Sequence, residues 1–233
     1  MAAASFVQQG KKIVAIGRNY SEHIKELKND TPGEPMFFLK PTSSYLPSGG
    51  NVEIPKGVTA HYEGWTPNFF ELGVVVGKSG RDISQADAGS HVAGYALAVD
   101  MTARNMQDVV KKKGHPWSAV KGFDTFTPIS SYIPKSSVPD PQNLNLTLKV
   151  NGLVKQDGNT GSMIFPIPRL IEHVSSIMSL EEGDLILTGT PSGVGPILPG
   201  DQVECAVSDN TGKQLATLTF GVVPRNGGYE FKP

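Results

Sequence analysis

Short runs of apolar residues, each closed by a turn residue, recur along the whole chain. Such runs are typical of β-strands, whereas a helix needs a longer segment with apolar residues at helical spacing. The pattern predicts strands at residues 12–17, 36–39, 51–54, 70–77, 94–99, 144–150, 153–155, 184–188, 202–207 and 214–220. Residues 70–77 and 94–99 are the most apolar of these runs, so we expect both in the core.

Helical spacing of apolar residues is confined to a few short segments. We expect one helix at residues 19–27 and another at residues 167–178. A third helix is predicted to begin at a Thr102 cap and to end at Lys113. The dipeptide at residues 151–152, Asn-Gly, predicts a hairpin turn between two strands. Together these elements predict a mixed, β-rich α+β fold with a few short helices.

The composition fits one globular domain over residues 1–233, with a flexible start at residues 1–11. The chain contains 26 Gly and 18 Pro, which indicates many turns, and no internal repeat or domain boundary is visible. Hydrophobic residues make up 38% of the chain and charged residues 18%. These proportions favour a packed core over a disordered chain.

Charge and cysteine content exclude several classes of partner. The net charge is −1 and no long basic run is present, which argues against nucleic acid as the main partner. No apolar run approaches membrane-spanning length, so we expect no membrane partner. The single cysteine, Cys205, cannot form an internal disulfide, suits a reducing compartment and is expected in the core. The N-terminal residues show no targeting peptide, which is consistent with a cytoplasmic protein.

Three acidic residues lie at or near the ends of apolar runs. Glu71 opens the run at residues 72–76, Glu63 closes the polar segment before it, and Asp100 ends the next apolar run, residues 95–100. Buried carboxylates are costly in free energy unless something pairs with them. A divalent metal ion with oxygen ligands is the partner that best suits several carboxylates at once.

Other polar residues could support chemistry at such a metal, although each also has a simpler interpretation. His23 and Glu26 share one face of the predicted helix, so they are either a water-activating pair or ordinary surface neighbours. Lys121 has apolar neighbours and could stabilise an enolate, or it could extend its ammonium group to solvent. Arg104 could hold an anionic substrate or form a surface pair with Asp108.

A series of motifs makes the combination more specific than its parts. In chain order they are Gly17-Arg-Asn-Tyr20, Phe38-Leu-Lys-Pro41, His61-Tyr-Glu63, Asp100-Met-Thr-Ala-Arg-Asn105, Lys121-Gly-Phe-Asp124, Gln156-Asp-Gly158 and Ile186-Leu-Thr-Gly-Thr-Pro191. With them the chain resembles the fumarylacetoacetate hydrolase family from about Lys12 to Phe231. Within that family it most resembles the branch of acylpyruvases, oxaloacetate decarboxylases and oxaloacetate tautomerases.

The resemblance implies a single catalytic domain with a β-sandwich or roll, a homodimer, and Mg²⁺ or Mn²⁺ held by three carboxylates. It implies small 2-oxo acids as substrates and an enolate shared by C–C hydrolysis, decarboxylation and keto–enol exchange. The family branch also suggests mitochondria as the compartment. By resemblance the metal ligands are Glu63, Glu71 and Asp100, the catalytic residues are His23, Glu26 and Lys121, and the substrate-binding residues are Arg18, Tyr20, Lys40, Arg104, Gln107 and Thr190.

One segment departs from the family pattern, in which the first two metal ligands form Glu-x-Glu. Here residues 64–70 stand where a single residue is usual. A continuous strand would separate Glu63 and Glu71 by about 26 Å, too far to share one ion. Either the segment loops out and Glu63 returns to the site, or Phe69 takes the position of the first ligand. A gene-structure error is a third interpretation, and a non-catalytic, metal-poor dimeric relative is the alternative function.

Overall fold

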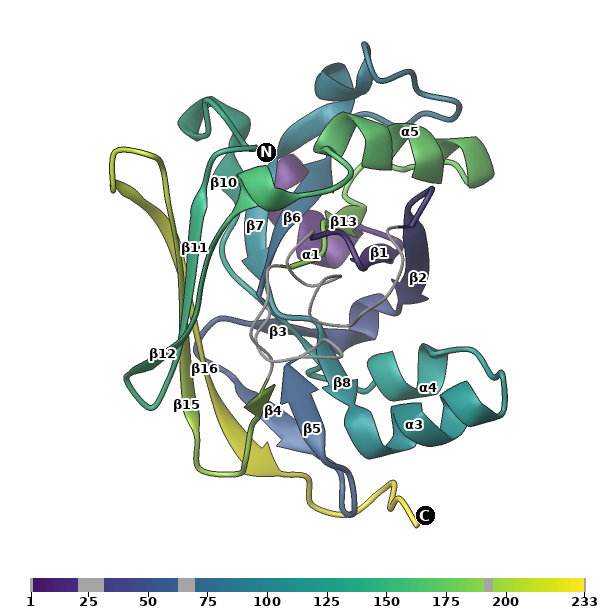
Figure 1. The fold of residues 1–233 in the computed structure, drawn as a ribbon, viewed down its shortest axis with the longest axis vertical. Helices are drawn as coiled ribbons and strands as arrows, with labels where there is room; N and C mark the ends of the chain where they lie inside the picture. The colour runs from purple at the N-terminus through teal and green to yellow at the C-terminus, as the bar shows by residue number, and fades with distance from the viewer. Residues whose placement is uncertain (1, 21–31, 63–69, 191–194, 233) are drawn as a thin grey trace.

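The computed structural model describes residues 2–20, 32–62, 70–190 and 195–232. The predictions for His23, Glu26 and Glu63 therefore lie outside the described residues. Two packed sheets dominate the molecule, and the helices lie at its edges (Figure 1). The predicted mixed, β-rich α+β class is confirmed.

The largest sheet within the described residues has eight strands in the order β2-β1-β13-β6-β7-β9-β3, with β10 paired to β7. Its strands are β1 (Ile13–Gly17), β2 (Met36–Lys40), β3 (Tyr45–Pro47), β6 (Glu71–Val76), β7 (Val92–Ala98), β9 (Thr127–Ile129), β10 (Ile133–Pro134) and β13 (Leu185–Leu187). Every residue of β6 is buried, as its uninterrupted apolar sequence predicts. The strand therefore lies in the centre of the protein, and so does the carboxylate with which it begins.

A second sheet faces the first and follows the order β12-β11-β15-β16-β4. It consists of β4 (Asn51–Ile54), β11 (Asn145–Val150), β12 (Leu153–Asn159), β15 (Gln202–Ser208) and β16 (Gln214–Pro224). Alternate residues of β11 are buried, so one face of this sheet packs on the core. Leu146 and Cys205 from this sheet share one cluster of buried residues with Val74 and Leu97 of the large sheet. Cys205 is buried in β15, as expected.

A third, smaller sheet has the order β14-β5-β8. Its strands are β5 (Ala60–Tyr62), β8 (Met101–Ala103) and β14 (Gly195–Pro196). Because β8 begins three residues after β7 ends, the chain turns from the large sheet into the small one at Asp100.

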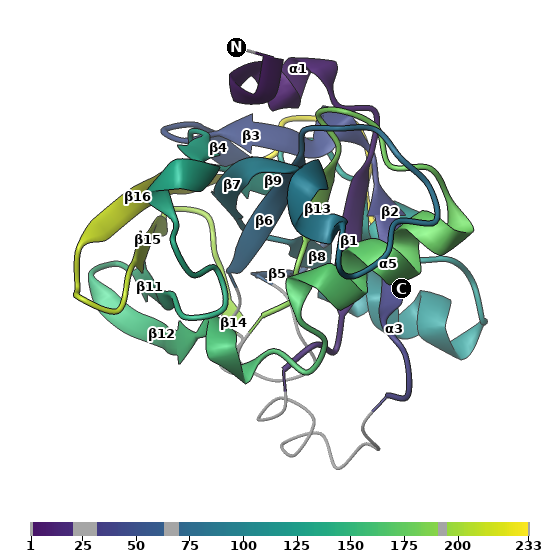
Figure 2. The ribbon, with the colours of Figure 1, turned by 90° about the horizontal axis from the view of Figure 1, so that it is seen from above.

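The helices are short, as the sequence predicts. They are α1 (Phe6–Gln9), α3 (Arg104–Lys112), α4 (Ser118–Lys121) and α5 (Ile167–Ile177), with 3₁₀ turns η1 (Ala2–Ser5), η2 (Thr42–Ser44), η3 (Ala88–His91), η4 (Lys135–Ser137) and η5 (Thr160–Ser162). Viewed from above, α5 runs along the side of the large sheet near β1 and β2 (Figure 2). Its apolar residues, among them Leu170 and Val174, are buried in the main core cluster. None of the helices in the described ranges is long and apolar enough to span a membrane.

One local expectation is wrong, and a second is wrong at its first two residues. Thr102 caps no helix, because Met101–Ala103 pair as a strand with β5 and α3 begins only at Arg104. Asn19 and Tyr20 lie outside any helix, and the rest of the helix predicted at 19–27 lies outside the described residues. Residues 2–9, within the segment expected to be flexible, form η1 and α1, and Phe6 is buried there. The expected flexibility of residues 1–11 stays a prediction.

Candidate functional site

Asp100 is held between two buried lysines. The ammonium nitrogen of Lys40 donates to Oδ1 of Asp100, and that of Lys121 donates to Oδ2 at 2.5 Å. Lys40 also donates to the backbone oxygen of Phe126 at 2.8 Å. The side chains of all three charged residues are at most 3% exposed. Hydrogen bonds of this kind between charged groups are strong, and here they offset the cost of burying the carboxylate.

These three residues come from distant parts of the chain. Lys40 is the last residue of β2 and Lys121 the last residue of α4, whereas Asp100 occupies the turn between β7 and β8. Contacts of α4 with both β2 and β8 bring the two lysines to the same turn. The packing of edge elements around that turn therefore assembles the site.

Glu71 lies on the same side of the core, at the start of β6. It pairs in register with Ala98, two residues before Asp100. The backbone N–H of Gly189 donates to its Oε2 at 2.9 Å. Gly189 has a φ of 79°, and a Cβ there would lie 2.8 Å from the Cβ of Asn19. Only glycine fits this position, so the turn after β13 delivers a backbone N–H to the carboxylate.

Burial and neighbouring charge both shift the protonation equilibria of the site. Burial raises the pKa of Glu71 well above its usual value, and the negative charge of Asp100 raises it further. Burial also raises the pKa of Asp100, while the adjacent Lys40 opposes that shift. Burial lowers the pKa of Lys121 well below its usual value, and the positive charge of Lys40 adds to the effect. The two carboxylates thus favour a further positive charge between them.

The oxygen atoms of Glu71 and Asp100 fit a hard divalent cation such as Mg²⁺ or Mn²⁺. The lysine contacts do not prevent coordination, because each carboxylate oxygen has two lone pairs and can accept an N–H as well as bind a metal. In the described ranges, no group of three or more His, Cys, Asp or Glu could hold a metal ion. The third predicted ligand, Glu63, lies outside those ranges.

Cationic and polar side chains border the carboxylates on the α3 side. Arg104 donates from Nη1 to Oε1 of Gln107 at 2.6 Å, and its charge interacts with that of Asp100. Lys111 lies on the same face of α3, seven residues after Arg104. The positive charges of Arg104 and Arg18 both contribute to lowering the pKa of Lys111, after the larger effect of burial. This concentration of positive charge suits an anionic substrate.

The remaining predicted binding residues lie around Glu71. Tyr20 is fully buried, and after burial itself the charge of Glu71 contributes to raising its pKa. Thr190 follows Gly189, and its hydroxyl accepts from Nε2 of Gln156 at 3.5 Å. The described residues thus bring together Lys40, Glu71, Asp100, Lys121, Arg104, Gln107, Tyr20 and Thr190. The charge of Arg18 acts on Lys111 of the adjacent α3.

Sequence reasoning missed the role of Gln156. This side chain is 1% exposed and reaches from β12 of the second sheet to the start of β6. Its Oε1 accepts the backbone N–H of Phe70 at 2.7 Å, immediately before Glu71. The sequence marks Gln156 through the motif Gln156-Asp-Gly158, but the motif does not show which group Gln156 contacts. The structure supplies that partner and shows that Gln156 fixes the backbone beside the carboxylate.

Asn19 is a second residue that sequence reasoning missed. Its side-chain amide donates to the backbone oxygens of Phe165 at 3.1 Å and Thr188 at 2.7 Å. Its Oδ1 accepts from the backbone N–H of Phe165 at 2.8 Å. Asn19 therefore ties the end of β1 to the turn that carries Gly189.

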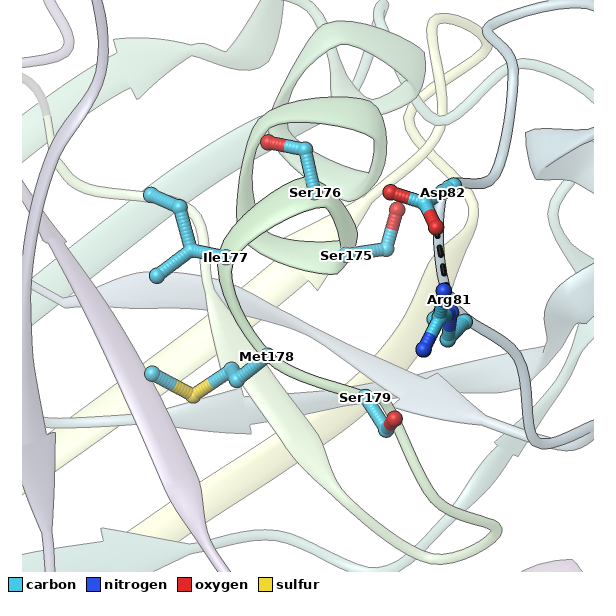
Figure 3. A pocket seen from close by; sticks show the side chains of 7 residues that line it. All are labelled: Arg81, Asp82, Ser175, Ser176, Ile177, Met178 and Ser179. Atoms are coloured by element: carbon cyan, nitrogen blue, oxygen red, sulfur yellow. Dashed lines mark hydrogen bonds and ion pairs between the residues drawn. The ribbon is translucent and has the colours of Figure 1, made fainter.

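A separate polar cavity of about 260 Å³ lies at the C-terminal end of α5 (Figure 3). The neighbouring residues Arg81 and Asp82 form an ion pair at 3.1 Å on one side of it, and Ser175, Ser176 and Ser179 complete its polar lining. None of the predicted site residues lines this cavity, so it is distinct from the carboxylate site.

Comparison with known proteins gives a consistent set of relatives. The family model "Fumarylacetoacetate (FAA) hydrolase C-terminal" matches residues 12–223. The chain is 54% identical over 205 residues to a mitochondrial oxaloacetate decarboxylase of Dictyostelium discoideum, covering 87% of this chain and 91% of the relative. It is 50% identical over 203 residues to a mitochondrial oxaloacetate tautomerase of Bos taurus, covering 87% and 89% of the two chains.

Solved structures of the same family have a similar fold over most of the chain. A fumarylpyruvate hydrolase from Pseudomonas aeruginosa, solved in complex with Mn²⁺ and pyruvate, superposes with a TM-score of 0.80 at 33% sequence identity. The match covers 92% of this chain and 90% of that one.

The contact between Gln156 and Phe70 can be tested by a matched pair of variants. Gln156→Leu leaves the buried N–H of Phe70 without an acceptor, so we expect the free energy of unfolding to fall by about 1–3 kcal/mol. Gln156→Met keeps the length of the side chain but also offers no oxygen acceptor, so it should lose a similar amount. Urea unfolding at neutral pH measures both, and native-like stability in either variant would contradict this role.

His61 should make folding stability depend on pH. Burial lowers the pKa of His61 to about 4, with a further contribution from the charge of Arg104. Because the unfolded chain binds this proton near pH 6.5 and the folded protein only near pH 4, stability should fall as pH drops through that window. His61→Asn should reduce this loss. Urea unfolding at pH 7.5 and pH 5 tests the expectation, and an unchanged pH dependence in the variant would refute it.

Proposed function

Because the chain belongs to the fumarylacetoacetate hydrolase family, we propose that it is a metal-dependent enzyme that acts on small 2-oxo acids. The reactions are oxaloacetate decarboxylation, oxaloacetate keto–enol tautomerisation and acylpyruvate C–C hydrolysis. The observation that carries the proposal is the buried group of Lys40, Asp100 and Lys121 beside Glu71. Buried, charge-coupled groups with shifted pKa values are typical of catalytic sites.

Glu63, Glu71 and Asp100 are the proposed ligands of Mg²⁺ or Mn²⁺. The Mn²⁺ bound in the Pseudomonas aeruginosa relative supports a divalent metal in this family. When bound, the metal would supply a Lewis acid that polarises the 2-oxo group of the substrate.

Strand register is compatible with the inclusion of Glu63. Tyr62 of β5 pairs with Met101 of β8, and Glu71 of β6 pairs with Ala98 of β7, both in antiparallel register. Eight residues separate Tyr62 from Glu71, but only two separate Ala98 from Met101. The connection between β5 and β6 is thus six residues longer than the connection that it faces.

Two assignments of the six extra residues follow from this register. If the extra residues are 64–69, then Glu63 pairs opposite Asp100. Only Phe70 then separates Glu63 from Glu71 in the strand pairing, so the side chains of Glu63 and Glu71 point to the same face. If the extra residues are 63–68, then Phe69 faces Asp100. We favour the first assignment, because a carboxylate beside Asp100 completes an oxygen ligand set and a phenyl ring does not.

The residues of the chain have distinct proposed roles. Lys121 stabilises the negative charge that develops on the enolate oxygen of the substrate. Lys40 holds Asp100 and contributes positive charge beside the substrate. His23, oriented by Glu26, deprotonates the water that attacks the distal carbonyl of an acylpyruvate. Oxaloacetate needs no such water, because its distal carboxylate leaves as CO₂.

Binding of the anionic substrate falls to the surrounding polar residues. Arg104, Gln107 and Arg18 are the proposed partners of substrate carboxylates, where guanidinium groups can bind in bidentate fashion. Tyr20 and Thr190 border the substrate near Glu71. We further propose a homodimer and a mitochondrial location, the latter because the close relatives are named as mitochondrial proteins.

The segment at residues 64–70 favours a second candidate function. A protein in which Glu63 fails to reach the site would keep only two carboxylates and bind metal weakly. It would then be a non-catalytic, dimeric member of the family. The deletion variants described below separate the two candidates.

Loss of the central carboxylate should abolish activity. In Asp100→Ala we expect metal-dependent turnover of oxaloacetate to fall by at least about 10³-fold, because several kcal/mol of transition-state stabilisation are removed. Turnover with Mg²⁺ or Mn²⁺ and metal affinity by calorimetry measure the effect, with circular dichroism as the control for folding. Turnover close to that of the native chain would rule out the assignment.

Two deletions of equal length distinguish the assignments of the extra residues. Deleting 64–69 leaves Glu63-Phe70-Glu71, whereas deleting 63–68 leaves Phe69-Phe70-Glu71. We expect the first variant to retain metal binding and turnover, and the second to bind metal at least about tenfold more weakly because it lacks one carboxylate ligand. Equal metal affinity in both variants would contradict a ligand role for Glu63. If the native chain is inactive and the first deletion creates activity, the native chain is the non-catalytic relative.

A further inference from the structure

Two aromatic rings lie against the buried ammonium group of Lys121. Its nitrogen is 4.5 Å from the centroid of the Phe38 ring and 6.0 Å from that of the Trp117 ring. The two rings also contact each other, with centroids 5.3 Å apart and planes inclined at 59°. Phe38 lies in the middle of β2, and Trp117 immediately precedes α4, which ends at Lys121.

The same two rings line an open surface pocket of about 320 Å³. The other lining residues are Met36, Phe37, His115 and Pro116. Lys121 itself has no exposed surface and does not line the pocket. Phe38 and Trp117 thus lie against the buried ammonium group of Lys121 and also line the surface pocket, and we call these two rings the wall.

We propose that Phe38 and Trp117 are positioning residues that hold the ammonium group of Lys121 against Asp100 and prevent it from turning into the surface pocket. For its catalytic consequence this inference rests on the proposed function, in which Lys121 stabilises the substrate enolate.

The physical argument begins with the freedom of the lysine side chain. Its four-carbon stem is flexible, and its ammonium group is strongly hydrated, so a lysine near the surface tends to reach water. Without the two rings, the adjacent pocket would offer Lys121 that alternative. The negative faces of the rings attract the cation and replace part of its lost hydration.

The wall can be tested by NMR of the full-length protein with ¹³Cε-labelled lysine. Protons close to an aromatic face resonate upfield, so the Cε protons of Lys121 should be shifted upfield. Their signal is assigned by its absence from the spectrum of Lys121→Arg. Phe38→Leu should remove most of this shift, whereas Phe38→Tyr should keep it. Phe37→Leu is the matched control, because Phe37 lines the same pocket but packs against His173 instead. Trp117→Leu tests the second ring if Phe38→Leu does not fold.

Steady-state kinetics adds a second test, because a general loss of packing would not lower kcat while leaving KM unchanged. For oxaloacetate, Phe38→Leu should lower kcat by about tenfold with little change in KM, and Phe38→Tyr should restore it. Phe37→Leu should leave both constants near their native values. If the Lys121 signal and kcat are both unchanged in Phe38→Leu and Trp117→Leu, the positioning role is wrong. If Phe38→Leu changes the Lys121 signal but not kcat, the ring contacts Lys121 without positioning it, and the positioning role is also wrong. If the native chain is inactive, the proposed function fails, and Trp117→Leu then decides the positioning role, because Phe38 remains there as a reporter: loss of the upfield shift supports the role and an unchanged shift contradicts it.

Discussion

The structure of this site depends on one buried charge. Asp100 lies in the interior with a lysine on each of its oxygens, and neither lysine would be stable there without it. Removing a single partner from such a group leaves an uncompensated charge, which costs several kcal/mol. The turn between β7 and β8, the end of β2 and the end of α4 are therefore bound to one another through this carboxylate. The chemistry proposed for the site uses the same contacts that hold these elements together.

The second carboxylate is arranged differently. Glu71 receives a backbone N–H from Gly189, and burial together with the charge of Asp100 disfavours its ionised form. A group in this state gains most from a new positive charge nearby, which is what a divalent cation provides. The site thus combines one carboxylate that is already neutralised by lysines with another that is poorly compensated. That contrast, rather than the number of acids alone, makes the pair suitable for a metal.

Much of the fold could be predicted from the sequence, because β6 and β7 are uninterrupted apolar runs and the Asn-Gly turn marks the β11–β12 hairpin. Thr102 shows the limit, since a three-residue strand has too weak a pattern to compete with a helix-cap signal. The carboxylates were visible as charges at the ends of apolar runs. The pairing of Asp100 with two lysines was not visible, because local spacing carries no information on how β2 and α4 pack around one turn.

Gln156 links the position of Glu71 to the packing of the two sheets. Its side chain reaches from one sheet of the sandwich to the other and accepts a hydrogen bond from the backbone next to Glu71. Any substitution in the interior that shifts the sheets against each other would move Phe70 with Gln156, and the carboxylate with Phe70. Sequence drift in a core far from the substrate can therefore tune the geometry of the proposed metal ligands, so that changes in activity need not involve any residue that contacts metal or substrate.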